Sequence, residues 1–469
     1  MQASEHALLL VRGQFAFTIG MHIVLAAFTM GLANFLMVLE ALWLRTRRRV
    51  YMDVYNYWLK LFALTTAAGV VTGIPMEFVF GLHWGRLSGA AGAVIGPLMF
   101  FEVLVAFFLE AGFLGIMLFG MKKVSRRVHF FATCMVALGS LVSAFWILSA
   151  NSWLHTPAGF ARAADGNFLP VDWLRIIFNP SFPWRMLHMS LAAFLATAAI
   201  IAAVGAWHVL RDTRNPGARL MFSMGLWVIA IVAPLQLLAG DLHGRNTLEH
   251  QPQKLAAIEG SWQRPPAGEG EPLRLFAIPD LQAQRNRHEL AIPHLGSLYL
   301  RHNLTGTIAG LREFPRSDLP PVPIVFFAFR GMVGLGLLLI AVGMLSLVLR
   351  ARRPIRGALA AAGGGDHGAI GHAGHAVRLG GDRGRPATFH RVWATAHRAQ
   401  HLATAAADGC QLQRGDSGAV PAGLRARPVP VAARAASAAA RARTRAIAGP
   451  GRSDRQLMHF VERVCASLR

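Results

Sequence analysis

The stretch that decides the fold is GPLMFFEVLVAFFLEAGFLGIMLFG, which runs from Gly96 to Gly120. It is apolar throughout except for two glutamates, Glu102 and Glu110. As a helix it is long enough to cross the hydrocarbon core of a bilayer, which takes about 20 residues. Two lysines, Lys122 and Lys123, follow it directly. The pattern predicts a transmembrane helix that carries two carboxyl groups inside the membrane.

Six further stretches have the same apolar character, so the sequence predicts an all-α, polytopic transmembrane helix bundle with seven spans. Their approximate limits, with the first stretch included, are 15–44, 59–80, 93–119, 129–150, 184–209, 220–239 and 322–349. The first span is too long for a removable signal peptide and lacks a small-residue cleavage site. The three cysteines, Cys134, Cys410 and Cys465, form neither a disulfide framework nor a zinc-type spacing.

The loops predict the orientation of the spans. Arginines and lysines gather after every odd-numbered span, at 45–49, 122–127, 211–219 and 350–356. Because basic loops stay on the cytoplasmic side, the N-terminus is expected to face outward. The even-numbered exits carry the longer loops, 151–183 and 240–321, which are therefore expected outside. A loop of about 80 residues is uncommon without a function.

Several spans contain ionisable side chains, which are costly in a membrane and therefore candidates for function. They are His22, Glu77, Glu102, Glu110, His188 and Arg330, the last beside Met332. Four of these positions lie within about ten residues of the outer end of their helix, or roughly 15 Å at a rise of 1.5 Å per residue. They are His22, Glu102, His188 and Met332. Their shared depth predicts one site near the outer face.

The residue types at this depth suit haem chemistry. Imidazole and thioether are ligands of haem iron, and a His/Met pair is typical of a low-spin electron-transfer haem. Glu102 and Glu110, eight residues apart, would lie about 12 Å apart along a regular helix and within about 80° of each other, which fits a proton relay. Simpler interpretations remain open: a membrane histidine often bonds a neighbouring helix, a methionine often packs, and Arg330 can reach the headgroups.

Five motifs together resemble subunit I of the cytochrome bd family of bacterial quinol oxidases. They are QFAFTIGMH, GPLMFFEVLVAFFLEAGFLGIMLFG, VALGSLVSAFWILSANSW, GDLHGRNTLEHQPQKLAAIEGSW and FFAFRGMVGLG. The resemblance keeps their order and spacing from about residue 8 to about residue 350. The stretch GDLHGRNTLEHQP is similar to the corresponding stretch of the cyanide-insensitive branch of the family.

The resemblance implies a quinol:oxygen oxidoreductase subunit that contributes to the proton gradient and contains a low-spin haem b, a high-spin haem b, and haem d or a further haem b. His22 would be an axial ligand at the oxygen site, with Glu102 as a ligand or proton donor and Glu110 on the proton path. His188 and Met332 would hold the low-spin haem, with Arg330 beside its propionates. Lys254 and Glu259 would belong to the quinol-oxidising loop. Taken alone, these two residues could equally be solvated charges.

The implied partners are a second membrane subunit, ubiquinol or menaquinol, and oxygen, in the bacterial cytoplasmic (inner) membrane. The net charge of +23 would ordinarily suggest nucleic acid or anionic lipid. However, 19 of the 47 basic residues follow Arg350, and no nucleic-acid partner is expected. Two alternatives stay open: a proton-coupled membrane transporter that uses the intramembrane acids, and a non-catalytic haem-binding remnant of a damaged oxidase gene.

The chain changes character near Arg350, which divides an oxidase domain at 1–350, with its quinol loop at about 240–321, from a tail at 351–469. The family has two further spans and a Thr-Glu-x-Gly-Arg-Gln-Pro stretch whose glutamate ligates the high-spin haem b. Codons for Gly381 to Arg398, read one nucleotide later, can encode Val-Thr-Glu-Val-Gly-Arg-Gln-Pro-Phe-Thr-Val-Tyr-Gly-Leu-Leu-Arg-Thr-Ala. The tail is therefore predicted to be frameshifted and disordered. The alternative is a genuine disordered basic extension.

Overall fold

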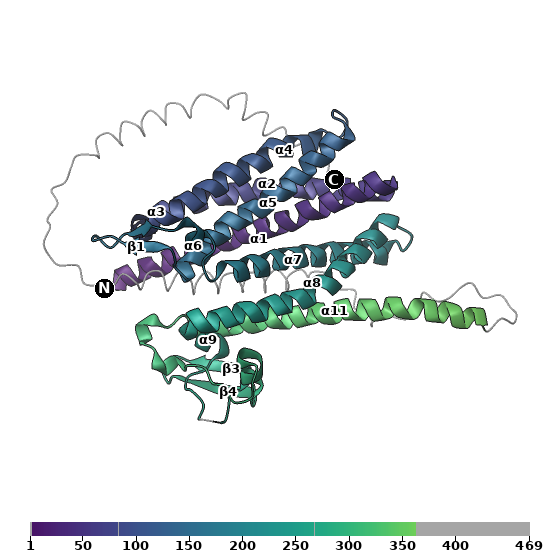
Figure 1. Cartoon of the computed structure of the whole chain (residues 1–469). Helices are drawn as coiled ribbons and strands as arrows, with labels where there is room; N and C mark the ends of the chain where they lie inside the picture. The colour runs from purple at the N-terminus through teal and green to yellow at the C-terminus, as the bar shows by residue number, and fades with distance from the viewer. Residues whose placement is uncertain (1, 83, 267, 363–469) are drawn as a thin grey trace, which may run out of the picture. The chain divides into compact units, whose positions relative to one another are not determined.

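The computed structural model describes residues 2–82, 84–266 and 268–362, which all belong to one compact unit of the chain. The described residues contain seven helical stretches long and apolar enough to cross a membrane (Figure 1). The predicted all-α membrane bundle is confirmed. The helices that build these stretches are α1 (Gln2–Thr46), α2 (Arg49–Leu82), α3 (Gly85–Phe101) with α4 (Phe108–Phe119), α5 (Arg126–His155), α7 (Phe182–Arg211), α8 (Pro216–His250) and α11 (Val322–Ala362).

The helices extend beyond the apolar stretches that predicted them. Helix α8 continues to His250, through the polar residues that follow Ala239. The apolar run marks the part of a helix that lies in lipid, whereas the helix itself ends where its backbone hydrogen bonds end. The loop between α8 and α11 therefore begins at Gln251. Helix α11 likewise continues past Arg350 to Ala362, and the rest of the predicted tail, 363–469, lies outside the described residues.

Two of the spans, α5 and α8, start with ordinary side-chain caps. Ser125 caps α5 by accepting a hydrogen bond from the backbone N–H of Val128. Asn215 caps α8 in the same way, and Pro216 occupies the first turn, where its missing N–H costs nothing. The short basic loops between the spans therefore end in defined helix starts.

Small residues let the helices pack closely. Helix α7 contacts α8 and α1, while α8 also contacts α11. At Gly225 of α8, a Cβ atom would lie 2.7 Å from the carbonyl oxygen of Ala198 in α7, which is closer than real Cβ atoms approach. Close backbone approach through small residues is how helices associate in a bilayer, where lipid competes with apolar side chains. Helix α8 is thus held between α7 and α11.

The span that contains Glu102 and Glu110 is not one regular α-helix. A π-helical segment, η1 (Glu102–Phe107), separates α3 from α4. The expected angle between Glu102 and Glu110 assumed 3.6 residues per turn, and this winding does not hold over the segment. A π segment widens the helix locally and is found frequently at functional sites. Here it begins at Glu102 itself.

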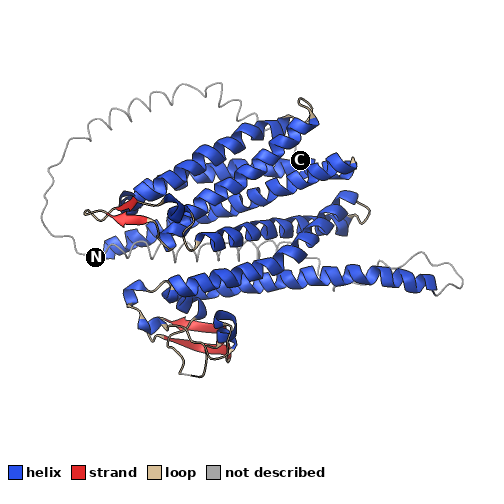
Figure 2. Cartoon of the chain, in the orientation of Figure 1, coloured by secondary structure: helices blue, strands red, loops and turns tan. Residues whose placement is uncertain are grey.

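Two long loops carry the remaining elements of the described residues, and the strands described there form two hairpins (Figure 2). The first loop contains β1 (Phe160–Arg162), β2 (Phe168–Pro170) and α6 (Trp173–Ile177). The second contains α9 (Pro252–Glu259), β3 (Leu273–Asp280), β4 (Arg285–Ile292), α10 (Leu295–Arg301), η2 (Leu311–Glu313) and η3 (Arg316–Asp318). Both α9 and β3 contact α11, so the second loop is attached to the last described span.

Candidate functional site

His22 lies on α1 and faces α2. Its Nδ1 atom is 3.2 Å from the carbonyl oxygen of Gly69 and 3.2 Å from the hydroxyl of Thr72. A carbonyl can only accept, so Nδ1 carries the proton and leaves Nε2 with its lone pair, as metal-binding histidines require. At Gly73, a Cβ atom would lie 3.1 Å from the imidazole Cε1. The glycine lets the ring lie close to α2.

Glu102 is held by α5. Its Oε1 atom accepts a hydrogen bond of 2.7 Å from the hydroxyl of Ser143. Glu110, on α4, lies within electrostatic range of the Glu102 carboxyl. Both side chains are partly buried. The structure therefore places the two acids within electrostatic reach of one another. The side chain of Glu77 is outside the described part of the chain.

His188 of α7 is enclosed by α8. The amide nitrogen of Gln236 lies 3.2 Å from its Nε2 atom, and the ring of His243 is 5.6 Å away between centroids. Gly240 lies between Gln236 and His243 in the sequence, and a Cβ atom at Gly240 would be 3.5 Å from the His188 ring. Met332 is carried by α11, which packs on the same helix. His188 and Met332 therefore come from the two helices that flank α8.

The structure gives three of these side chains different neighbours. His22 faces α2, Glu102 faces α5 and His188 faces α8. Met332 lies on α11, which also packs on α8. The single site near the outer face stays a prediction, and the neighbours of each side chain could not be predicted from the sequence.

The α7–α8–α11 region fits a haem. An imidazole and a thioether supply the donor set of a low-spin haem iron. The space beside His188 is lined by glycine rather than by a larger residue, and no atom lies within 4 Å of where a Cβ of Gly244 would be. The buried side-chain oxygen of Gln236, next to His188, has no hydrogen-bond partner. A planar group with polar edges would occupy that space and offer such a partner.

Arg330 connects α11 to the loop between α8 and α11. Its guanidinium donates to the carbonyl oxygen of Ile258 and, at 2.9 Å, to the carbonyl oxygen of Arg274. It also lies over the ring of Phe326, 3.5 Å from the centroid. Arg330, which was predicted to stand beside the haem propionates and lies two residues before Met332, thus binds backbone atoms of this loop.

Glu259 is buried at the end of α9. Its carboxylate accepts a hydrogen bond from the hydroxyl of Tyr299 and lies 3.7 Å from the guanidinium of Arg330. Burial raises the pKa of Glu259 above its ordinary value, and the Arg330 charge and the Tyr299 hydrogen bond offset this only in part. The following residue, Gly260, has φ +66°, and a Cβ there would press on Phe326 at 2.8 Å. The acid is thereby locked against α11.

Lys254 lies on α9, five residues before Glu259, and only 8% of its surface is exposed. Glu259 is 1% exposed. The alternative that both residues are simply solvated charges is therefore wrong. Two buried, ionisable side chains on one short helix are costly unless they are used or paired.

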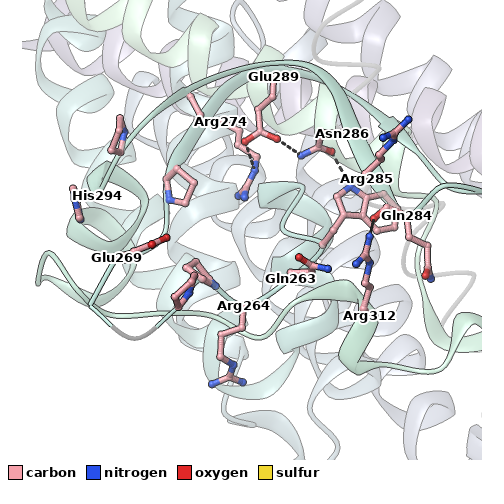
Figure 3. Close-up of a pocket in the computed structure, with 17 residues that line it drawn as sticks. Gln263, Arg264, Glu269, Arg274, Gln284, Arg285, Asn286, Glu289, His294 and Arg312 are labelled. Atoms are coloured by element: carbon pink, nitrogen blue, oxygen red, sulfur yellow. Dashed lines mark hydrogen bonds and ion pairs between the residues drawn. The ribbon is translucent and has the colours of Figure 1, made fainter.

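A cavity of about 530 Å³ lies in the same loop (Figure 3). Its lining includes Arg274, Asn286 and Glu289, which come from β3 and β4. Glu289 accepts from Asn286 at 2.8 Å and pairs with Arg274 at 3.0 Å. Arg274 thus lines the cavity through its side chain and accepts from Arg330 through its backbone. The cavity and the buried Glu259 region share this residue.

Comparison with known proteins decides the family. A family model described as cytochrome bd terminal oxidase subunit I matches residues 10–405.

The chain belongs to this family.

The Escherichia coli (strain K12) cytochrome bd-II ubiquinol oxidase subunit 1 is 34% identical over 347 residues, which cover 69% of this chain and 67% of that protein. The Bacillus subtilis (strain 168) cytochrome bd ubiquinol oxidase subunit 1 is 31% identical over 358 residues, or 74% and 76% of the two chains. The solved bd oxidase from Geobacillus thermodenitrificans has a TM-score of 0.71 at 25% identity and covers 87% of each chain.

The predicted function is confirmed at the level of the family: the chain is a subunit of a haem-containing terminal quinol oxidase with several transmembrane helices. The assignment displaces the transporter alternative, because the family is one of terminal oxidases.

The buried ion pair in the loop gives a stability prediction for this bd oxidase subunit. Arg274→Ala leaves the fully buried Glu271, its partner at 2.6 Å, without a counter-charge. Loss of one partner of a buried pair costs about 3 kcal/mol. Backbone amides of β3 and β4 are therefore expected to exchange hydrogen roughly 100-fold faster. Arg264→Ala is the control, because its ion pair with Glu313 is largely exposed; equal exchange rates in the two variants would contradict the prediction.

Sequence reasoning missed one buried pair. Glu40 of α1 and His129 of α5 are 0% and 1% exposed, and their Oε1 and Nδ1 atoms lie 2.7 Å apart. Glu40 lies close to the basic loop that follows span one, where an acid is usually read as interfacial. Its distance from that loop was visible in the sequence, but its burial depends on how α1 packs against α5.

Proposed function

We propose that quinol is oxidised at the second external loop by the buried pair of ionisable residues on α9. Quinol that loses two electrons must also release two protons, and a carboxylate is the natural acceptor. Glu259 is positioned for this by Tyr299, and Lys254 supplies a positive charge on the same helix. The adjacent cavity, at about 530 Å³, has the size of a small-molecule site. The sequence leaves ubiquinol and menaquinol both open as the substrate.

The contact that supports this proposal most directly is that of Arg330 with the loop. It binds the carbonyl oxygen of Ile258, next to Glu259, from a position two residues before Met332. The proposed proton acceptor and a proposed haem ligand are therefore attached to the same turn of α11. We propose His188 and Met332 as the axial ligands of a low-spin haem b, and His22 and Glu102 as residues of the oxygen site, with a high-spin haem b and haem d or a further haem b.

When bound, the haems would supply the one-electron carriers between quinol and oxygen. The residues of the chain then have separate tasks: His22 presents Nε2, Glu259 accepts a proton outside, and Glu102 and Glu110 deliver protons to the oxygen side. We propose that the N-terminus faces outward in the bacterial cytoplasmic membrane and that a second membrane subunit covers this one. The test is whether added quinol reduces the haem of the purified chain without oxygen.

We also propose that residues 351–469 are a frameshifted reading of the two further spans of the family. The supporting observation is the shifted reading of Gly381 to Arg398, which contains Glu-Val-Gly-Arg-Gln-Pro. The chain as translated then lacks the glutamate ligand of the high-spin haem. The low-spin site and the quinol loop are complete without it, because their residues precede Arg350.

This proposal predicts a difference between two genes. The frame-corrected gene is expected to yield a quinol-dependent oxygen consumption that the 469-residue chain lacks, while both bind the low-spin haem. The measurement is oxygen uptake with quinol in membranes that contain equal amounts of either protein. An in-frame genomic read across codons 350 to 385, together with oxygen uptake by the 469-residue chain, would falsify the frameshift.

A further inference from the structure

The Glu40–His129 pair lies between α1, α4 and α5 and is closed to solvent. His129 Nε2 is 3.1 Å from the carbonyl oxygen of Met117, so this nitrogen must donate. Thr133 donates to the second carboxylate oxygen of Glu40 at 2.6 Å. The remaining 2.7 Å contact joins Nδ1 of His129 to Oε1 of Glu40. It needs one proton, which either atom can hold, because an imidazole nitrogen and a carboxylate oxygen can each donate when protonated and accept when not.

The pair lies near the basic end of the bundle. Glu40 is six residues before Thr46, the end of α1, which places it about 9 Å along the axis from that end. His129 is in the first turn of α5. The guanidinium of Arg126 lies over the Trp43 ring at 5.4 Å, directly beside this end. In the proposed orientation this is the cytoplasmic side, from which protons for oxygen reduction are drawn.

A polar stripe on α5 leads from the pair toward Glu102. Residues His129, Thr133, Ser140 and Ser143 are spaced by four, seven and three positions, so at 100° per residue they stay within about 80° of one another. The stripe covers roughly 20 Å along the helix. Its far end is Ser143, which donates to Glu102 at 2.7 Å. Each of these four side chains can donate and accept a hydrogen bond, and together they mark one polar face of α5 between the pair and Glu102.

A second connection leads to Glu110. Met117, whose carbonyl oxygen accepts from His129, is seven residues after Glu110 on α4. Seven residues return to nearly the same face of a helix and rise about 10 Å. The pair thus contacts α4, which carries Glu110, and shares α5 with Ser143, which bonds Glu102.

We infer that Glu40 and His129 form an inner proton-uptake site that receives protons from the cytoplasmic side and passes them along α5 and α4 toward Glu102 and Glu110. The inference rests on the proposed function, since oxygen reduction near the outer face consumes protons. A proton that arrives on the pair displaces the one shared between Nδ1 and Oε1, and no electron moves there. Two other titratable groups adjoin the pair: Tyr55, whose hydroxyl lies 3.5 Å from Thr133, and Cys134, which is within electrostatic range of Glu40.

The alternative is a fixed ion pair that only holds α1 against α5. Infrared difference spectra of the full chain in lipid vesicles, recorded between acidic and alkaline pH, separate the two. An uptake site gives a carboxyl band that changes with pH, is lost in Glu40→Gln and is retained in Glu249→Gln, which removes an exposed acid near the far end of α8. Thr133→Val, which removes the hydrogen bond to Glu40, keeps the band but shifts its frequency, and so serves if Glu40→Gln fails to fold.

Identical difference spectra in the parent and Glu40→Gln, or an unshifted band in Thr133→Val, would overturn the inference. Reduction of bound haem by quinol, measured in the same parent sample, reports on the proposed function independently. Failure of the uptake site and failure of the quinol oxidase proposal are therefore seen in different signals.

Discussion

Replacing His188 with alanine is expected to abolish the low-spin haem absorbance of the chain. The imidazole would supply one axial bond. The other imidazole beside it, near Gly240 and Gly244, is that of His243. Met332→Leu is expected to have the same effect on the low-spin signal, because leucine keeps the volume of the side chain and removes the sulfur. The measurement is the reduced-minus-oxidised spectrum and the haem-to-protein ratio of purified samples.

Two matched variants control for damage to the helices. His208→Ala removes a histidine from the last turn of the same helix α7, at the other end of the span. Met344→Leu changes a methionine of α11 that is 48% exposed. Both are expected to keep the parent spectrum. A normal low-spin signal in His188→Ala and Met332→Leu would show that other residues hold the iron.

Glu259→Gln is expected to slow the reduction of bound haem by quinol roughly 100-fold or more, with haem content unchanged. Loss of a positioned proton acceptor typically costs 100- to 10,000-fold, as an order of magnitude. Lys254→Ala is expected to slow the same step. The control is Glu249→Gln, an exposed acid of the preceding helix. Loss of haem from either loop variant would instead indicate a structural role for this loop.

The pH dependence of that step has a defined sign. Glu259 accepts a proton only when its carboxylate is ionised, and burial raises its pKa above the ordinary glutamate range. The rate of quinol-driven haem reduction is therefore expected to rise as the pH increases through this raised pKa. Glu259→Gln is expected to lose that rise. Stopped-flow rates across a pH series measure it, and a parent profile that is flat or falls with pH would contradict the role.

The sequence was sufficient for the membrane architecture because hydropathy reports directly on what lies in lipid. All seven spans followed from the length and hydropathy of the apolar stretches. The π segment at Glu102 did not, since its sequence is as apolar as a regular helix and the change in winding depends on packing with α5. The loop hairpins were missed as well, because β3 and β4 include Pro279 and a charged run rather than a clean alternation.

Candidate site residues could be selected from the sequence, but their neighbours in the structure could not. Buried glutamates and histidines stand out in an apolar sequence, yet which helix face they occupy depends on neighbours far along the chain. Arg330 illustrates this, since its partners at Ile258 and Arg274 are 72 and 56 positions away. Glu40 is a different case. An acid so close to a basic loop is usually interfacial, whereas the structure buries this one fully.

Anaerobic addition of a quinol to the purified chain tests the central claim most directly. The account predicts that the chain contains low-spin haem and that quinol reduces it, at a rate that depends on Glu259, whether or not oxygen is consumed. A folded chain that binds no haem, or whose haem is reduced by dithionite but not by quinol, would contradict it.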